Sequence, residues 1–343
     1  MNLRQLEYFV AIVELGSLSK AAERVHIVQP ALTQHVKNLE EEFGTPLLLR
    51  SRKGVLPTEA GQRLLTKAKV LLDQFEAIRD FVRGEDVEPH GEVRVGIPTT
   101  ASSLLSARLL RESKLAYPNI KLSIVEPMSG FFFDWLAEAK VDIAVLYRRT
   151  WDRNLKFDRV LSEEICLVGR NNKKLAELAP DDARIAFRQA CELPLVVPNR
   201  GHGLRDLLED LASKSQCRLN VVMEIDAYTP MKALVEQGVG FCFLPGAATN
   251  DEQKLGRLTA RNVTDPEIWR DVYLATPTDR PLSRAAELIH GLCKALLMQL
   301  VHERNWIARI ETADDDRAFG EGFSAGGSNA IADPPRILPC FAE

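Results

Sequence analysis

The sequence predicts an N-terminal all-α winged helix-turn-helix with a long dimerisation helix, followed by a two-lobed α/β domain. Three observations predict this fold. Apolar residues recur at helical spacing up to residue 83, a polar stretch with glycine and proline follows, and strand and helix patterns then alternate. The predicted segments are the winged helix-turn-helix at 1–58, the long helix at 59–83, a hinge at 84–91, the α/β domain at 92–304, and a disordered tail at 313–343.

The composition is that of a soluble globular protein with more than one domain. The 343 residues are 45% hydrophobic and 27% charged, with a formal net charge of -4. No apolar run approaches the roughly 18 residues that cross a bilayer, and the N-terminus with Glu7 does not resemble a secretory signal. We therefore expect a cytoplasmic protein without a membrane partner, on which any nucleic-acid site is a local basic patch.

The first two predicted helices are short. Asn2 can cap the first and Gly16 ends it, with apolar positions at Leu3, Leu6, Phe9, Val10 and Val13. The second begins near Ser17 or Ser19. Its small residues allow another helix to approach closely: Ala21 and Ala22.

A third helix is predicted with Pro30 at its first position and Gly44 as its stop. One face is expected to be buried: Leu32, Val36, Leu39 and Phe43. The opposite face is mostly polar: Pro30, Thr33, Gln34 and Lys37. Two short helices joined by a tight turn, the second presenting small polar side chains, form a helix-turn-helix.

A basic hairpin and a long helix come next. Short strands flank the turn Ser51-Arg52-Lys53-Gly54, which predicts a wing. Thr58 can then cap a helix of about 26 residues, about 39 Å long. Its apolar residues follow a heptad pattern: Leu64, Ala68, Leu71, Phe75, Ile78 and Val82. We expect this seam to pair with a second copy of the chain; the alternative is packing against the chain's own α/β domain.

Beyond the hinge, the alternation of strands and helices predicts a parallel sheet with helices on both faces, arranged as two lobes around a cleft. Several loops place polar residues where a strand ends and a helix begins, a position that can hold an anion. These residues are Thr99, Thr100, Ser102, Ser103, Ser129, Gly130, Pro198 and His202. The alternative for each hydroxyl is ordinary helix capping.

The N-terminal segment resembles the DNA-binding domain of LysR-type bacterial transcriptional regulators. The resemblance rests on an ordered set of residues: Phe9, Gly16-Ser17, Ala21-Ala22, Gln29-Pro30-Ala31, Leu39-Glu40, Gly44, Arg50 and Thr58-Glu59-Ala60-Gly61. It is detailed over about the first 85 residues and looser to about residue 300. The stretch "SGFFFDWLAEAKVDIAVLY" is most similar to the nitrogen assimilation control branch.

The resemblance implies a regulator that reads double-stranded DNA. Gln34 can contact adenine, Lys37 can reach guanine or a phosphate, and Thr33 offers a hydroxyl or methyl group. Gln29 and Pro30 lie at the helix entry. The wing residues would hold phosphates: Arg50, Arg52 and Lys53.

The resemblance also implies a dimer or a tetramer and a small-molecule effector in the cleft of an α/β domain of periplasmic-binding-protein type. The branch resemblance leaves open regulation without an effector. RNA polymerase is a further candidate partner. We expect no cofactor and no metal, since the sequence has no C-x-x-C motif and its histidines are scattered.

Three other functions remain open. An enzyme is disfavoured because the sequence lacks the G-x-S-x-G, P-loop, G-x-G-x-x-G and H-E-x-x-H motifs. A solute-binding protein of the same fold is disfavoured by the N-terminal DNA module. A thiol redox sensor is the third. Cys191 and Cys217 are a candidate pair. Cys166 and Cys242 lie on either side of them, so that each of the four cysteines is about 25 residues from the next, and only sulfurs within bonding range would support a bridge.

Overall fold

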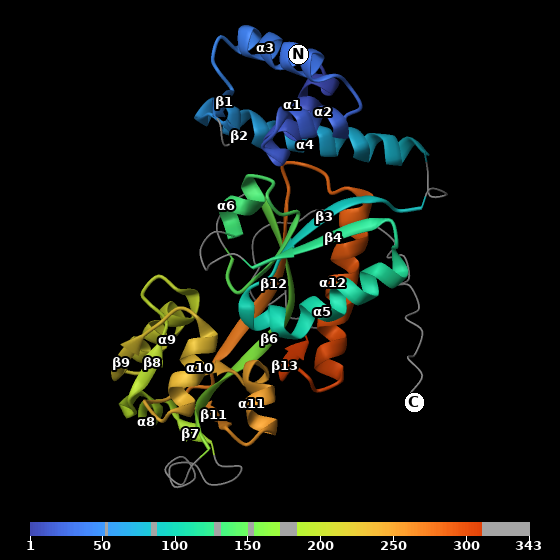
Figure 1. Cartoon of the computed structure of the whole chain (residues 1–343). Helices are drawn as coiled ribbons and strands as arrows, with labels where there is room; N and C mark the ends of the chain where they lie inside the picture. The colour runs from blue at the N-terminus through green and yellow to red at the C-terminus, as the bar shows by residue number, and fades with distance from the viewer. Residues whose placement is uncertain (52–53, 84–87, 127–131, 150–153, 172–183, 311–343) are drawn as a thin grey trace, which may run out of the picture. The chain divides into compact units, whose positions relative to one another are not determined.

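The computed structural model describes residues 1–51, 54–83, 88–126, 132–149, 154–171 and 184–310 (Figure 1). The chain divides into two compact units. Unit 1 comprises Met1–Asp158, Pro198–Leu207 and Tyr273–Leu288, and unit 2 comprises the remaining described residues. The predicted wing residues Arg52 and Lys53, the loop residues Ser129 and Gly130, and the tail at 313–343 lie outside the described residues.

The N-terminal part of unit 1 is a winged helix-turn-helix with a long helix behind it. Its elements are α1 (Leu3–Leu15), α2 (Leu18–Arg24), α3 (Gln29–Phe43), β1 (Leu48–Ser51), β2 (Gly54–Pro57) and α4 (Glu59–Arg83). The expected caps are present: Asn2 and Gln5 form a capping box, and Gly16 closes α1 with φ 60°. The Thr58 hydroxyl accepts a hydrogen bond from the backbone N–H of Gly61 (2.9 Å) at the start of α4.

The core of this domain forms where the three short helices and the wing meet. It contains Phe9, Ile12, Ala21, Ala22, Leu32, Leu39 and Leu47. Gly61 is required by this packing, because a Cβ there would lie 2.0 Å from the carbonyl oxygen of Leu47. Two sequence predictions need correction. Helix α3 begins at Gln29, one residue before Pro30, and Phe43 is 44% exposed because it lies in the last turn before the Gly44 cap.

The α/β part of unit 1 contains three adjacent parallel strands in the order β4-β3-β5, joined by crossover helices. Its elements are β3 (Gly91–Gly96), α5 (Thr99–Ala116), β4 (Ile120–Val125), α6 (Phe132–Ala137) and β5 (Ile143–Leu146). Part of β12 (Trp269–Pro277) extends the sheet antiparallel to β5. The carboxyl ends of β3, β4 and β5 therefore meet at one edge of the sheet.

Unit 2 is built around the long strand β6 (Leu155–Arg170), which begins in unit 1. The prediction of a parallel sheet is wrong here, because β10 (Cys242–Pro245), β11 (Leu258–Thr264) and β13 (Ala308–Ile310) all pair antiparallel with β6. The reason is the path of the chain. Strands β6 and β12 each cross between the two units, and the later strands that pair with β6 in unit 2 run back alongside it in the opposite direction.

The remaining elements of unit 2 complete an α/β arrangement, with α9 beginning in unit 1 and α12 shared between the units. They are β7 (Ile185–Ala186), α8 (Phe187–Glu192), β8 (Leu195–Val197), α9 (Gly203–Lys214), β9 (Val221–Glu224), α10 (Tyr228–Glu236), η1 (Gly246–Thr249), α11 (Asn250–Lys254) and α12 (Arg284–His302). Strands β8 and β9 run parallel in a separate two-stranded sheet. Among the described helices, none combines the length and apolar character needed to cross a bilayer.

Candidate nucleic-acid interface

Helix α3 presents the polar face that its sequence predicts. The buried side of α3 is formed by Leu32, Val36 and Leu39, which fix the helix on the core of the winged helix-turn-helix. The winged helix-turn-helix and α4, residues 1–83, are called the head below. On the other side Gln29, Pro30, Gln34 and Lys37 are exposed, and Thr33 is half-buried. Burial of one stripe determines the rotation of the helix about its axis, so these polar side chains necessarily face outward.

Short-range contacts organise this face. The Ser19 hydroxyl donates to Gln29 Oε1 (2.9 Å), and Gln34 Nε2 donates to Asn38 Oδ1 (2.8 Å). Sequence reasoning missed Asn38, whose signal was its i+4 spacing from Gln34. A bound base can replace such exposed amide contacts at small cost, because each exchanges one hydrogen bond for another.

Lys37 is held only weakly by its own chain. Its Nζ lies 3.5 Å from Glu41 Oε1, and both side chains are well exposed, at 65% and 63%. Exposed pairs of this kind contribute about 0–1 kcal/mol, so a phosphate can compete with Glu41 for the lysine. Lys37 is therefore available for a DNA contact.

The wing is anchored to α3 by an acidic residue. Glu40 Oε1 accepts hydrogen bonds from the backbone N–H groups of Leu47 (2.8 Å) and Leu48 (3.2 Å). In the hairpin, Arg50 pairs in register with Val55. The carboxylate of Glu40 is thus committed to positioning the wing and does not add to the open polar face of α3.

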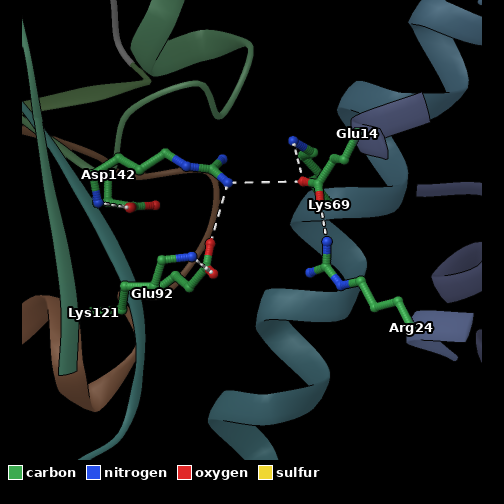
Figure 2. A network of polar contacts seen from close by, with 7 residues as sticks. Glu14, Arg24, Lys69, Glu92, Lys121 and Asp142 are labelled. Carbon is green, nitrogen blue, oxygen red and sulfur yellow. Dashed lines mark hydrogen bonds and ion pairs between the residues drawn. The ribbon is translucent and has the colours of Figure 1, made fainter. Parts of the chain in front are cut away.

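Glu14 joins three helices of the head (Figure 2). Its carboxylate lies 2.9 Å from Lys69 Nζ on α4 and 3.2 Å from Arg24 NH1 on α2. Burial alone would raise the pKa of Glu14, but the hydrogen bond and charge of Lys69, with the charges of Arg24 and Arg94, hold that pKa below its usual value. Glu14 therefore stays ionised and fixes α1 and α2 relative to the long helix.

The same network continues onto the first strand of the α/β part of unit 1 (Figure 2). Arg94 NH2 on β3 lies 3.8 Å from Glu14 and 3.5 Å from Glu92, and Lys121 on β4 pairs with Glu92 at 2.6 Å. The backbone N–H of Arg94 donates to Asp142 Oδ2 (2.8 Å). The sequence alone could not indicate this link, since its members come from separate elements.

The heptad seam of α4 changes character along its length. Leu64 packs against the core of the head and Ala68 is fully buried. The next four seam residues are exposed: Leu71 (44%), Phe75 (38%), Ile78 (61%) and Val82 (77%). Single exposed apolar residues are common, but four along one helix face form a continuous apolar stripe.

The candidate effector residues around the start of α5 lie at the carboxyl ends of the parallel strands of unit 1. Thr99 is exposed, whereas Thr100 and Ser102 are buried in the first turns of α5. The Thr100 hydroxyl is hydrogen-bonded to Tyr147, just after β5, and the Ser102 hydroxyl to Glu126, just after β4. Sequence reasoning missed Tyr147 and Glu126, although the rule that parallel strands end at one edge could have indicated them.

The predicted residues of the 198–203 loop belong to the start of α9. The carbonyl of Pro198 accepts a hydrogen bond from Arg205 NH1 (3.1 Å), and His202 Nδ1 accepts one from the backbone N–H of Leu204 (3.2 Å). His202 therefore acts as a helix cap, the alternative that the sequence left open. No cluster of metal-binding side chains occurs among the residues that the structure describes.

Comparison with known proteins identifies both halves of the chain. Residues 3–62 match the family described as bacterial regulatory helix-turn-helix protein, lysR family. Residues 87–297 match the family described as LysR substrate binding domain. The first match covers the three short helices, the wing and the start of α4. The second match covers nearly all of the α/β region.

Relatives of known name align over almost the whole chain. The nitrogen assimilation regulatory protein nac of Klebsiella aerogenes is 30% identical, over 88% of this chain and 95% of that protein. Nac of Escherichia coli (strain K12) is 29% identical, over 89% and 99%. Among solved structures, full-length OxyR from Pseudomonas aeruginosa has a TM-score of 0.69 at 23% identity, covering 86% of this chain and 98% of that one.

A solved complex with DNA shares the fold. CbnR complexed with its target DNA has a TM-score of 0.51 at 18% identity, and the match covers 87% of this chain and 99% of that chain. At this identity the likeness shows the fold alone. The predicted architecture, a helix-turn-helix followed by a two-domain α/β region, is confirmed.

Proposed function

Because the chain belongs to the LysR family of DNA-binding transcriptional regulators, we propose that its helix α3 reads base sequence in the major groove. The observation that carries the proposal is the exposed polar face of α3, fixed outward by three fully buried residues. The known relatives of this family regulate transcription, and the nac proteins support a nitrogen-regulator-like branch.

Each residue of this face has a specific proposed contact. The amide of Gln34 can bind adenine through two hydrogen bonds, once it releases Asn38. Lys37 binds a phosphate or guanine, and the half-buried Thr33 packs its methyl group or offers its hydroxyl. Gln29 and Pro30 contact the DNA at the helix entry. Arg50 and the wing tip, Arg52 and Lys53, would bind phosphates and set the register.

Lys37→Ala should weaken DNA binding and flatten its dependence on salt concentration, because the variant loses a positive charge from the DNA-facing side of α3. Removing one phosphate contact is expected to reduce the slope of log K against log salt concentration by about 1. Fluorescence anisotropy over a series of salt concentrations measures this slope. Lys140→Ala is the matched control, because Lys140 is also an exposed lysine paired with a nearby glutamate, Glu138, but lies in the bend after α6. Equal slopes together with equal affinities for the wild type and Lys37→Ala would exclude Lys37 from the interface.

We further propose that two chains associate through α4. The exposed residues Leu71, Phe75, Ile78 and Val82 supply a heptad seam, and a second copy presents the identical seam. One helix-turn-helix contacts few base pairs, so a two-fold dimer on a palindromic site gains the missing specificity. A tetramer would require a second interface besides α4. Contact with RNA polymerase stays a prediction.

A small-molecule effector is proposed at the carboxyl ends of β3, β4 and β5. The match to the LysR substrate binding domain and the polar residues gathered there support this site. Thr99 and the N-terminal N–H groups of α5 suit a polar or anionic molecule. The buried Thr100 and Ser102 already have protein partners, so an effector would have to displace or extend those contacts.

A DNA target also supports a cytoplasmic location.

A further inference from the structure

The cysteines of unit 2 differ sharply in their surroundings. Cys242 and Cys293 are fully buried, and Cys166 donates a weak hydrogen bond to Asn262 Oδ1 at 3.8 Å. In contrast, the Cys217 thiol adjoins Cys191 closely enough to raise the pKa of Cys191, and neither cysteine forms a disulfide.

The backbone holds the two thiols together independently of any bond between them. The carbonyl of Cys191, in α8, accepts a hydrogen bond from the backbone N–H of Asn220 (2.9 Å). The N–H of Leu195 also donates to the carbonyl of Asn220 (2.8 Å), and the N–H of Cys217 donates to the carbonyl of Ala212 at the end of α9 (2.9 Å). The segments around residues 191–195 and 217–221 therefore run side by side, which favours a disulfide without large backbone movement.

The two thiols are not equivalent. Cys217 is partly exposed, in the connection between α9 and β9, so a solute can reach it. Cys191 is fully buried. Burial and the adjacent Cys217 thiol raise the pKa of Cys191 to about 12, so Cys191 remains protonated at neutral pH. Oxidation is therefore expected to begin at Cys217.

We propose that Cys191 and Cys217 form a reversible dithiol–disulfide site in unit 2, oxidised by hydrogen peroxide or another hydroperoxide. The Cys217 thiolate attacks the peroxide, forming an S–O bond while the O–O bond breaks and hydroxide leaves. The sulfur of Cys191 then attacks the Cys217 sulfenic acid, forming the S–S bond. The sulfenic oxygen leaves as water with the proton of Cys191. Thiol reductants reverse the reaction.

This site is separate from the DNA-reading function, which does not depend on it. It would join α8 covalently to the α9–β9 connection, so its direct effect is confined to unit 2. Serine at either position prevents the bridge without changing the polar face of α3, and failure of this proposal would leave the proposed DNA function intact.

The test uses the reduced full-length protein, exposed to a small molar excess of hydrogen peroxide and then alkylated with iodoacetamide. Trypsin places the two cysteines in separate peptides, Gln189–Arg200 and Ser215–Arg218, each with a single cysteine. The expected result is these peptides joined and lighter by two hydrogens than their sum, with the link lost after dithiothreitol. Cys166, Cys242 and Cys293 should be alkylated only after unfolding.

Variants test the order of the steps. Cys191→Ser should trap the sulfenic acid, giving a dimedone adduct on Ser215–Arg218 that is at least several-fold more abundant than in the wild type. Cys340→Ser should leave the link unchanged. The proposal is overturned if the wild type shows no joined peptides, if Cys217 links instead to another cysteine, or if dimedone labels wild type and Cys191→Ser equally.

Discussion

Ile78→Glu and Phe75→Glu are each expected to abolish the proposed α4 dimer, which leaves monomers at micromolar concentration. Both side chains are exposed in the single chain, at 61% and 38%, so the substitutions should leave the fold intact. In the dimer they would bury a carboxylate against apolar side chains, whereas each native apolar residue contributes about 1.5–3 kcal/mol when fully buried. We expect the dimer dissociation constant to rise by at least about 100-fold.

Sedimentation velocity measures the change directly. Gln62→Glu adds the same charge to an exposed position earlier on α4 and serves as the control, which should remain dimeric. Monomeric variants should also lose affinity for a palindromic site much more than for a half-site. A stable dimer in both seam variants would mean that the exposed stripe of α4 packs against something other than a second copy.

Glu163→Gln should destabilise unit 2 strongly. Glu163 on β6 is 1% exposed, and its Oε1 accepts a hydrogen bond from Arg270 Nε on β12 at 2.7 Å. Its Oε2 accepts one from the indole N–H of Trp306 (2.9 Å), which holds the segment leading to β13. Glutamine removes the charge that compensates the buried Arg270 guanidinium, and breaking such a pair costs about 3–5 kcal/mol.

Urea unfolding followed by circular dichroism reports this loss as a lower midpoint. Glu236→Gln is the matched control in the same unit. Glu236 pairs with Arg257 at 3.6 Å near the surface, where an ion pair contributes about 0–1 kcal/mol. If Glu163→Gln and Glu236→Gln had equal urea midpoints, the buried Glu163–Arg270 pair would not stabilise the packing of β6, β12 and β13.

The head could be predicted from the sequence because its signals are local. Asn2, Gly16, Gly44 and Thr58 mark helix ends through contacts within a few residues. The strand β11 and the first half of β6 were not predicted, because their residues lack a continuous apolar run. They are stabilised by pairing with strands far away in the sequence, which no local pattern encodes.

The residues of the candidate sites could likewise be predicted where their signal is local, but not where the fold brings distant residues together. The polar face of α3 follows from the spacing of its own buried residues. Tyr147 and Glu126 reach the start of α5 only through the strand order β4-β3-β5. Spacing alone could not choose among several cysteine pairs, whereas the fold brings Cys191 to Cys217.

The most direct test of sequence reading by α3 is to sequence the genomic fragments that the purified protein retains, alongside a Thr33→Ala/Gln34→Ala double variant. Both substitutions lie on the outward face and spare the buried stripe of Leu32, Val36 and Leu39. We predict a shared, roughly palindromic motif that the variant loses, because each good base contact contributes about 1–3 kcal/mol of discrimination. Genes beside the motif would indicate the chemical class of the effector. Fragments without a motif, or equal retention of the same motif by the variant, would contradict the assignment of α3 as the reading helix.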